Sequence, residues 1–525
     1  MDMTPSRRLL AIADDLSGAA EVAAAVCSRT TRSRVLLFGG PGAVGMATAL
    51  RPRHAGEATV LDLDSRYRPA AEAAEAVRGA LRMSWPDGGG QDAVAAPGPS
   101  DTLEALDTFV LKKIDSLLRG NVAAEIAALA EGGAGVVLAP ALPIAGRVVR
   151  SGVVHIGGVP LHEGDAWRAE AVPPPASVAQ ALGGLPTAPI PLATVRSSRP
   201  TLLTALRAAA TAGRVAICDA ETDADLDAIV EASLADGPGM RLVGSGGLAL
   251  ALGRHLTTAS PATGARAAPG TGSPAAAGPA APGATGSAVP GATGSVATAV
   301  GGPAVSDSWG RGAADATRAA VLASAAGTAA SSAQTGRPVL VVVGTAEPAA
   351  VEQVRRLVED GASHHPLPLA ALLADGSPVR LPALTAAVTV VSLSASPESP
   401  GPAPAYEAVA LPSPRPAPSS VGGAEPVSGR RLVLGLARAV GAAVAAHDGA
   451  VDLVLTGGET ARRVLDALAV AELDPVGQVH HGAVHLRTPD GRSVVTRPGS
   501  FGDPDSLRHI VRALRPHSTE RKVTS

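Results

Sequence analysis

Short apolar runs alternate with longer Ala-rich amphipathic segments through the first half of the chain. The apolar runs have the length of buried strands, and we predict strands at 9–15, 34–40, 58–65, 109–116, 135–143, 214–220 and 241–247. The amphipathic segments between several of them predict helices at 18–29, 70–82 and 221–235. Strands that alternate with helices in this way indicate a mainly parallel sheet flanked by helices.

The same pattern returns later in the chain, where 338–361 and 451–470 each predict a strand, a Gly-containing turn and a helix. Between the two halves, 261–305 contains one charged residue, Arg266, and repeats the sequence GATGS. Such a segment buries too little apolar surface to offset the entropy of ordering, so we predict a disordered spacer. The expected fold class is α/β, with two domains whose mainly parallel sheets are flanked by helices. The expected boundaries are 1–256 for the N-terminal domain, 257–335 for the Ala/Gly/Pro-rich spacer, 336–515 for the C-terminal domain and 516–525 for a flexible tail.

The composition of the chain disfavours nucleic-acid-binding and membrane proteins. Aromatic residues make up 2% of the 525 residues and the net charge is -3, which disfavours nucleic-acid binding. No apolar run reaches the length of about 18 residues that a membrane-spanning helix needs, and the apolar run near the N-terminus is too short for a signal peptide. We therefore expect a cytoplasmic protein with no membrane partner. Cys27 and Cys218 lack the spacing of a zinc site and are expected to be core residues.

Paired carboxylates follow the first predicted strand in the sequence ADDLSGAAE. Asp14 and Asp15 would repel one another, so their retention at a strand end suggests a metal, a sugar hydroxyl or a proton to manage. Ser17 or Gly18 can begin the next helix. The alternative is a helix cap with a solvated neighbour.

A second polar cluster follows the strand at 58–65. Asp62 and Asp64 are expected to share one face of that strand, and Arg66 follows them. An arginine at a strand end can bind a carboxylate or phosphate through two parallel hydrogen bonds, although a structural ion pair would use the same residue.

The sequence KKIDSLLRGN concentrates charge at the end of another strand. Lys113 and Asp115 are expected to point to the same side, and Ser116, Arg119 and Gly120 to form the turn and the start of a helix. Basic side chains beside a helix N-terminus favour an anion, whereas the alternative is a solvated run of charges. Lys112 falls on the opposite face of the strand and is expected to take no part.

Gly-rich turns follow predicted strands at 244, 344, 457 and 499, where backbone N–H groups could approach a phosphate closely. No ordinary P-loop sequence occurs. The stretch 244–249 fits the GxGxxA dinucleotide fingerprint, but the next acidic residue is Asp307, far beyond the spacing of about 20 residues that ribose binding requires. A dehydrogenase is therefore disfavoured.

Ten motifs in order resemble those of the four-carbon acid sugar kinase family: ADDLSGA, DLDSR, KKIDSLLRGNV, PALPIAGR, GVPLHE, DAET, GSGGLA, GTAEP, TGGETA and PGSFG. The resemblance implies an ATP-dependent kinase of small sugar acids such as threonate, erythronate or 3-oxo-tetronates, with ATP and Mg²⁺ as cofactors. It implies a substrate side formed by Asp14, Asp15, Ser17, Gly18, Arg66, Lys113, Asp115, Ser116, Arg119, Gly146, Arg147 and His162. It implies a nucleotide side formed by Gly344, Thr345, Gly457, Gly458, Glu459, Thr460, Gly499 and Gly502.

The chain departs from the family pattern mildly at Ser17, where the family usually has Thr, and in the turn PGSFG, which is SGNFG-like in the family. Two further departures are larger. Ile114, Leu117 and Asn121 replace two hydroxyls and an imidazole, which leaves the choice of substrate open. The nucleotide turn GTAEP brings in Glu347, which would repel a phosphate unless Mg²⁺ intervenes or the side chain turns away.

Phosphoryl transfer depends mainly on positioning and on neutralising charge. We expect Arg66, Lys113 and Arg119 to hold the substrate carboxylate, with Asp15 or Asp115 as the catalytic base. Asp15 is preferred, because Asp115 lies between two cations that would hold it ionised. The alternative is a catalytically impaired sensor of a sugar acid or nucleotide, and a homo-oligomer is compatible with the sequence.

Overall fold

The computed structural model describes residues 8–28, 31–39, 57–82, 108–168, 170, 172–237, 239–258, 337–374, 376, 379–394, 425–499 and 501–515. The chain before 261 and after 327 belongs to one compact unit, in which every described residue lies. The predicted tail falls outside the described residues, as does the predicted spacer except for Thr257 and Thr258, which belong to the helix Gly246–Thr258. The four domain boundaries stay a prediction.

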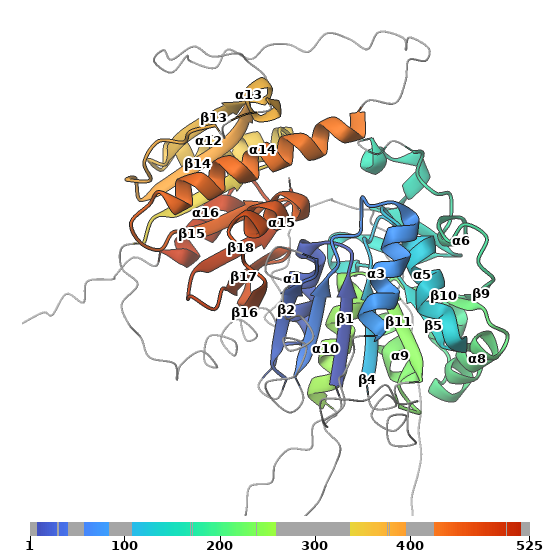
Figure 1. Ribbon diagram of the computed structural model, residues 1–525. Coiled ribbons are helices and arrows are strands. Elements are labelled where there is room, and N and C mark those ends of the chain that lie inside the picture. The colour runs from blue at the N-terminus through green and yellow to red at the C-terminus, as the bar shows by residue number, and fades with distance from the viewer. Residues whose placement is uncertain are drawn as a thin grey trace, which may run out of the picture. The chain divides into compact units, whose positions relative to one another are not determined.

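The N-terminal half contains a parallel sheet in the order β2-β3-β1-β4-β11-β5-β10-β9 (Figure 1). Its strands are β1 Arg8–Ala13, β2 Ser33–Leu37, β3 Ala58–Asp62, β4 Thr108–Lys113, β5 Gly135–Ala139, β9 Thr187–Ile190, β10 Val215–Cys218 and β11 Met240–Gly244. Its helices are α1 Leu16–Val26, α3 Ala70–Arg82, α5 Val122–Ala130, α6 Val178–Ala181, α7 Leu192–Val195, α8 Arg199–Thr211, α9 Asp223–Ser233 and α10 Gly246–Thr258. A separate antiparallel sheet consists of β6 Arg147–Arg150, β7 Val153–Ile156 and β8 Val159–Pro160. Four 3-10 turns lie at Glu131–Gly133, Pro143–Ala145, Leu161–Glu163 and Asp165–Trp167.

The C-terminal half adds strands in the order β13-β14-β12-β15-β18-β17-β16, of which β16 and β17 are antiparallel. The strands are β12 Val339–Val343, β13 Ser363–Pro368, β14 Val388–Ser394, β15 Asp452–Thr456, β16 Glu472–His480, β17 Ala483–Arg487 and β18 Ser493–Arg497. The helices are α12 Pro348–Glu359, α13 Leu369–Leu373, α14 Glu425–Ala445, α15 Gly458–Ala467 and α16 Ser506–Leu514. Pairing of β16 with β2 joins the two sets of strands into one sheet of 15 strands.

Strand order reverses once in each half. The chain leaves β1 for β2 and β3 on one side and then crosses to β4 on the other, and it leaves β12 for β13 and β14 before crossing to β15. In open parallel sheets, ligands bind outside the carboxyl ends of the strands at such a switch point. Residues that follow β1, β3, β4, β12 and β15 are therefore placed where a ligand is expected.

The core is aliphatic, as the composition predicts. Ala, Val, Leu and a single Ile supply the buried side chains of β1, β5 and β12, and both faces of these strands are covered. A fully buried Val or Leu contributes about 1.5–3 kcal/mol of transfer free energy, so the core is built from many moderate contributions. No helix among the described residues combines the length and apolarity needed to cross a membrane.

The predicted α/β class is confirmed, and the seven predicted strands of the N-terminal half are present. The prediction that Asp62 and Asp64 share a strand face is wrong, because β3 ends at Asp62 and Asp64 has a left-handed φ of 51°. The helix after β4 begins at Val122, later than predicted, because Gly120 turns the chain with a φ of 89°.

Candidate active site

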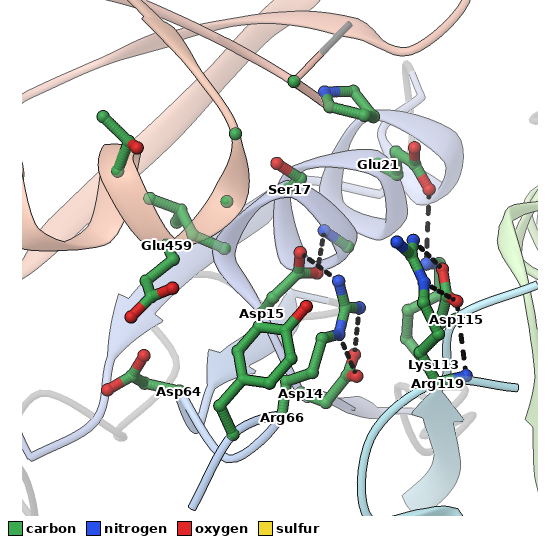
Figure 2. Close-up of a pocket in the computed structure, with 18 of the residues that line it drawn as sticks. Asp14, Asp15, Ser17, Glu21, Asp64, Arg66, Lys113, Asp115, Arg119 and Glu459 are labelled. Carbon is green, nitrogen blue, oxygen red and sulfur yellow. Dashed lines mark hydrogen bonds and ion pairs between the residues drawn. The ribbon is translucent and has the colours of Figure 1, made fainter. Parts of the chain in front are cut away.

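A pocket of about 330 Å³ lies at the carboxyl ends of β1, β3, β4, β12 and β15 (Figure 2). The predicted residues that line it are Asp14, Asp15, Ser17, Gly18, Arg66, Lys113, Asp115, Ser116, Arg119, Arg147, Gly344, Gly457, Gly458, Glu459, Thr460 and Gly499. Gly146, His162, Thr345 and Gly502 do not line it. The lining also includes Glu21, Tyr67, Arg430, Arg463, His481 and Phe501, which the sequence reasoning missed.

Asp14 and Asp15 are held together by Arg66. The guanidinium donates to both oxygens of Asp14, at 2.7 and 2.9 Å, and to Oδ2 of Asp15 at 2.8 Å. Burial raises the pKa of Asp14, but the charges of Arg66 and Lys112 outweigh it and the net pKa is lowered. The pKa of Asp15 is raised, because burial and the neighbouring Asp14 charge outweigh the charges of Arg66 and Lys113 and the hydrogen bond from the Gly18 N–H. The pair therefore divides into a fixed anion and a carboxylate better suited to accept a proton.

Asp15 is also the N-cap of α1, since its Oδ1 accepts a 2.8 Å hydrogen bond from the Gly18 N–H. The helix-cap alternative is thus correct for this residue, and it coexists with a place in the pocket. The buried Ser17 hydroxyl next to it has no hydrogen-bond partner among the described residues, which leaves it available to a ligand. A Cβ at Gly458 would lie 2.4 Å from Asp15 Oδ2, so only glycine permits this close approach.

The end of β4 contributes a second charged group. Arg119 donates to both oxygens of Asp115, at 2.6 and 3.0 Å, and this outweighs burial and holds the pKa of Asp115 well below its usual range. Lys113 Nζ lies 3.3 Å from Glu21 Oε2. Burial opposes the charged form of Lys113, but Glu21 and the Asp15 and Asp14 charges outweigh it and raise its pKa.

Arg147 differs from the other cations of the pocket. Its guanidinium donates to the Ser116 hydroxyl, and no carboxylate within the described ranges pairs with it. Burial lowers its pKa, the effect expected where a cation lacks a counter-ion. Among the predicted substrate residues it is the cation whose charge is least neutralised by the protein.

Lys112 does not line the pocket but has a structural part that the sequence reasoning missed. It is fully buried, and its Nζ lies 3.0 Å from Glu125 Oε2. Glu125 also accepts a hydrogen bond from the Ser65 hydroxyl, at the residue that precedes Arg66. Successive side chains of a strand point to opposite faces, so Lys112 points away from the pocket and toward Glu125 when Lys113 points into it. The sequence therefore indicated the face that Lys112 occupies.

Asn121, at a departure from the family pattern, also ties the turns together. Its side-chain amide donates to the carbonyl oxygens of Ser65 and Arg68, both at 2.8 Å. The turn after β4 is thereby fixed to the turn that carries Arg66. Asn121, which stands where the family pattern has a histidine, therefore has a structural contact in this chain.

Glycine turns and one acidic residue form the other wall. A Cβ at Gly344 would lie 2.0 Å from the Thr460 hydroxyl, so the turn after β12 packs directly on the start of α15. Glu459, in the first turn of α15, has no ion pair or hydrogen bond with the described residues, and burial raises its pKa. Asp64 lies near it, bound to Arg463 at 2.5 Å.

Glu347 turns away from the pocket. Its carboxylate pairs with Arg168, and the residue is the N-cap position of α12, followed by Pro348. The repulsion that the GTAEP sequence suggested therefore does not arise in this arrangement.

Comparison with known proteins matches the two halves of the chain to two different domain families. A sugar-binding N-terminal domain model matches residues 9–252, and a nucleotide-binding C-terminal domain model matches 340–507. A D-threonate kinase of Cupriavidus necator is 36% identical over 247 residues, which cover 46% of this chain and 53% of that protein. One of Bordetella bronchiseptica is 33% identical over 248 residues, covering 46% and 54%. The alignments thus span about half the length of these curated relatives.

Solved structures share the fold. A Salmonella typhimurium protein, provisionally labelled a tRNA synthase, superposes with a TM-score of 0.59 at 16% identity over 96% of this chain and 99% of its own. A Haemophilus influenzae protein gives 0.55 at 16% identity over 96% and 100%. At these identities the likeness concerns the fold alone. The two domain matches, together with the sugar-acid kinase relatives, show that this chain belongs to the four-carbon acid sugar kinase family.

Proposed function

We propose that this protein transfers the γ-phosphoryl group of ATP to a hydroxyl of a small four-carbon sugar acid of the threonate, erythronate or 3-oxo-tetronate type. The observation that carries the proposal is the pocket itself. Its lining combines a carboxylate with a raised pKa, Asp15, with the incompletely neutralised cation Arg147 and the glycine turns at 344 and 457. The D-threonate kinase relatives support the same substrate class.

The substrate carboxylate is assigned to Arg147, supported by Ser116 and Ser17. This proposal replaces the expectation from sequence that Arg66, Lys113 and Arg119 hold the substrate carboxylate. Each of those three already pairs with a carboxylate of the protein, so less of its charge is available to an anion. Arg66 instead holds Asp14 and Asp15 in place, and Lys113 pairs with Glu21.

Asp15 is the proposed base. Asp15 lines the pocket, with Oδ2 held by Arg66 and Oδ1 held by the Gly18 N–H. Its raised pKa makes it a better acceptor than Asp115 for the proton of the attacking hydroxyl. As the hydroxyl oxygen bonds to the γ-phosphorus, the bond between the γ-phosphorus and the bridging oxygen of ADP breaks. The hydroxyl proton passes to Asp15, and ADP leaves. Closure of the pocket around the reacting groups would be needed to limit hydrolysis of ATP by water.

Mg²⁺ fits the proposed nucleotide side. The ion is commonly held by one or two carboxylates together with substrate phosphates, and Glu459 offers a carboxylate that no described cation binds. No group of three or more metal-binding side chains occurs within the described residues, so phosphates and water would complete the shell. When bound, Mg²⁺ would neutralise the negative charge of the nucleotide phosphates, with Glu459 as the residue that holds it.

A coupled assay of ADP release against a panel of four-carbon sugar acids tests the proposal. We expect release that depends on both ATP–Mg²⁺ and one class of sugar acid. The second candidate is a catalytically impaired sensor, favoured by the altered Lys113–Asn121 stretch. Binding of sugar acid or nucleotide by calorimetry without any ADP release would support the sensor. A cytoplasmic location and a homo-oligomer stay predictions.

A further inference from the structure

The last residue of β18, Arg497, is completely buried behind the Gly-containing turn that follows the strand. Its guanidinium donates to the carbonyl oxygens of Gly499, at 2.9 Å, and Phe501. It also donates to the side-chain oxygens of Gln353 on α12 and Ser506 on α16. Every one of these acceptors is neutral.

No carboxylate within the described residues lies within ion-pairing distance of Arg497, and its Nε has no hydrogen-bond partner there. Burial lowers the pKa of Arg497 to about 10, with no neighbouring acid to oppose the shift. A buried charge without a counter-ion is costly, and the cost falls when an opposite charge binds nearby. The C-terminal half therefore holds a buried positive charge that no acidic side chain in the described part of the chain neutralises.

The turn over this charge is fixed in one orientation. Gln353 Nε2 donates to the carbonyl oxygen of Asp503 at 2.8 Å and lies 3.3 and 3.4 Å from those of Gly502 and Phe501. The inward carbonyl of Phe501 turns the N–H of Gly502 away from Arg497, because the two groups of a trans peptide point in opposite directions. Gly502 has a φ of 97°, and a Cβ there would lie 2.7 Å from the Ser506 hydroxyl. Glycine is thus required at this position.

This turn is part of the wall of the pocket, through Pro498, Gly499 and Phe501. An anion bound against it would lie next to a cation that is separated from water by one turn of chain. Electrostatic attraction is stronger where water is excluded, so even an indirect interaction would depend on the ligand's charge.

We propose that Arg497 is a positioning residue for the nucleotide polyphosphate: it fixes the turn at Gly499 and Phe501, and its buried charge favours ligands in proportion to their number of phosphate charges. This inference rests on the proposed function. It adds a discrimination between nucleotides by charge, made by a residue that does not itself line the pocket.

Calorimetry with adenosine, AMP, ADP and ATP, each without and with Mg²⁺, tests the inference on the full chain. The titrations without Mg²⁺ carry the comparison, because only there does the ligand's negative charge rise with its number of phosphates. For Arg497→Met we expect a loss of affinity that grows from within about twofold for adenosine to about 10- to 100-fold for ATP. Gln353→Leu is the matched control, because it removes a neutral contact to the same turn. It should weaken all four ligands by a similar factor.

Arg497→Lys keeps the charge and loses the forked hydrogen bonds, so it should retain the dependence on phosphate number even if Arg497→Met does not fold. An equal loss for all four ligands in Arg497→Met, or a flattened dependence in Arg497→Lys, would overturn the inference. If the wild-type chain bound none of the phosphorylated ligands, the proposed nucleotide use itself would fail, and the inference with it. Unchanged affinities in Arg497→Met beside normal wild-type binding would remove the inference alone.

Discussion

Lys112 Nζ lies 3.0 Å from Glu125 Oε2, and neither side chain is more than 1% exposed. The pair joins β4 to α5, and through the Ser65 hydroxyl it reaches the turn that carries Arg66. A buried ion pair of this kind is weak support for stability by itself, but removal of one partner leaves an uncompensated charge. The interaction therefore holds the site's framework in one arrangement.

Lys112→Met should lower the free energy of unfolding of the N-terminal half by about 3 kcal/mol, because Glu125 would be left buried without its cation. The midpoint of urea or thermal unfolding measures the change. The double variant Lys112→Met with Glu125→Leu removes both charges and should recover much of the loss. A single variant as stable as wild type would show that the pair is not the constraint we describe.

The pH dependence of turnover distinguishes the two candidate bases. The base must be ionised, so kcat/KM falls as the pH drops through its pKa. Because the pKa of Asp15 is raised above the ordinary value of an aspartate, we expect the acidic limb to lie above that ordinary value. Asp115 has a pKa well below its usual range and would place the limb lower. A limb below the ordinary aspartate pKa would therefore contradict the assignment to Asp15.

Replacing Asp15 by Asn should abolish turnover while nucleotide binding persists. The amide keeps the shape of the side chain, but it cannot accept the hydroxyl proton in the same way. Steady-state assays and calorimetry on the same preparation separate the two effects. Retained turnover would rule out Asp15 as the base.

Arg147→Met should raise KM for the sugar acid about 10- to 100-fold and leave KM for ATP unchanged, since a hydrogen bond to a charged group contributes about 1.5–3 kcal/mol. Arg150 lies on the same strand, is paired with Glu221 and does not line the pocket. Arg150→Met is thus the matched control and should leave both constants near wild type. A parallel rise in both KM values for Arg147→Met would point to a general disturbance of the fold.

Gly458→Ala should lower kcat at least about tenfold, because its Cβ would lie 2.4 Å from Asp15 Oδ2 and Asp15 is held by two other contacts. Gly79, in α3, has open space around it, and Gly79→Ala is expected to leave activity intact and to stabilise slightly. If Gly458→Ala were fully active, Asp15 would have freedom that the structure does not indicate.

The sequence predicted the α/β class and the strand ends that line the pocket, because apolar strands and the polar residues after them are local signals. It placed Asp15, Lys113 and Gly458 correctly at such ends. It could not reveal which charges are already neutralised, since the bonds of Arg66 to Asp14 and Asp15 join residues more than 50 positions apart. That information changed the proposed carboxylate ligand to Arg147.

Other residues were missed for the same reason. The link of Lys112 to Glu125 and the burial of Arg497 beneath its own turn depend on how distant elements pack. The sheet register shows only which face a residue occupies. Its partner on that face follows from the tertiary structure.

Phosphorus NMR of the reaction mixture tests the proposed kinase activity most directly. With ATP, Mg²⁺ and the four-carbon sugar acids offered one at a time, we expect ADP and a new phosphomonoester in equal amounts for one class of acid. The Asp15→Asn variant should give neither product. ATP that remains intact with every acid, or that yields inorganic phosphate without a phosphoester, would contradict a sugar-acid kinase.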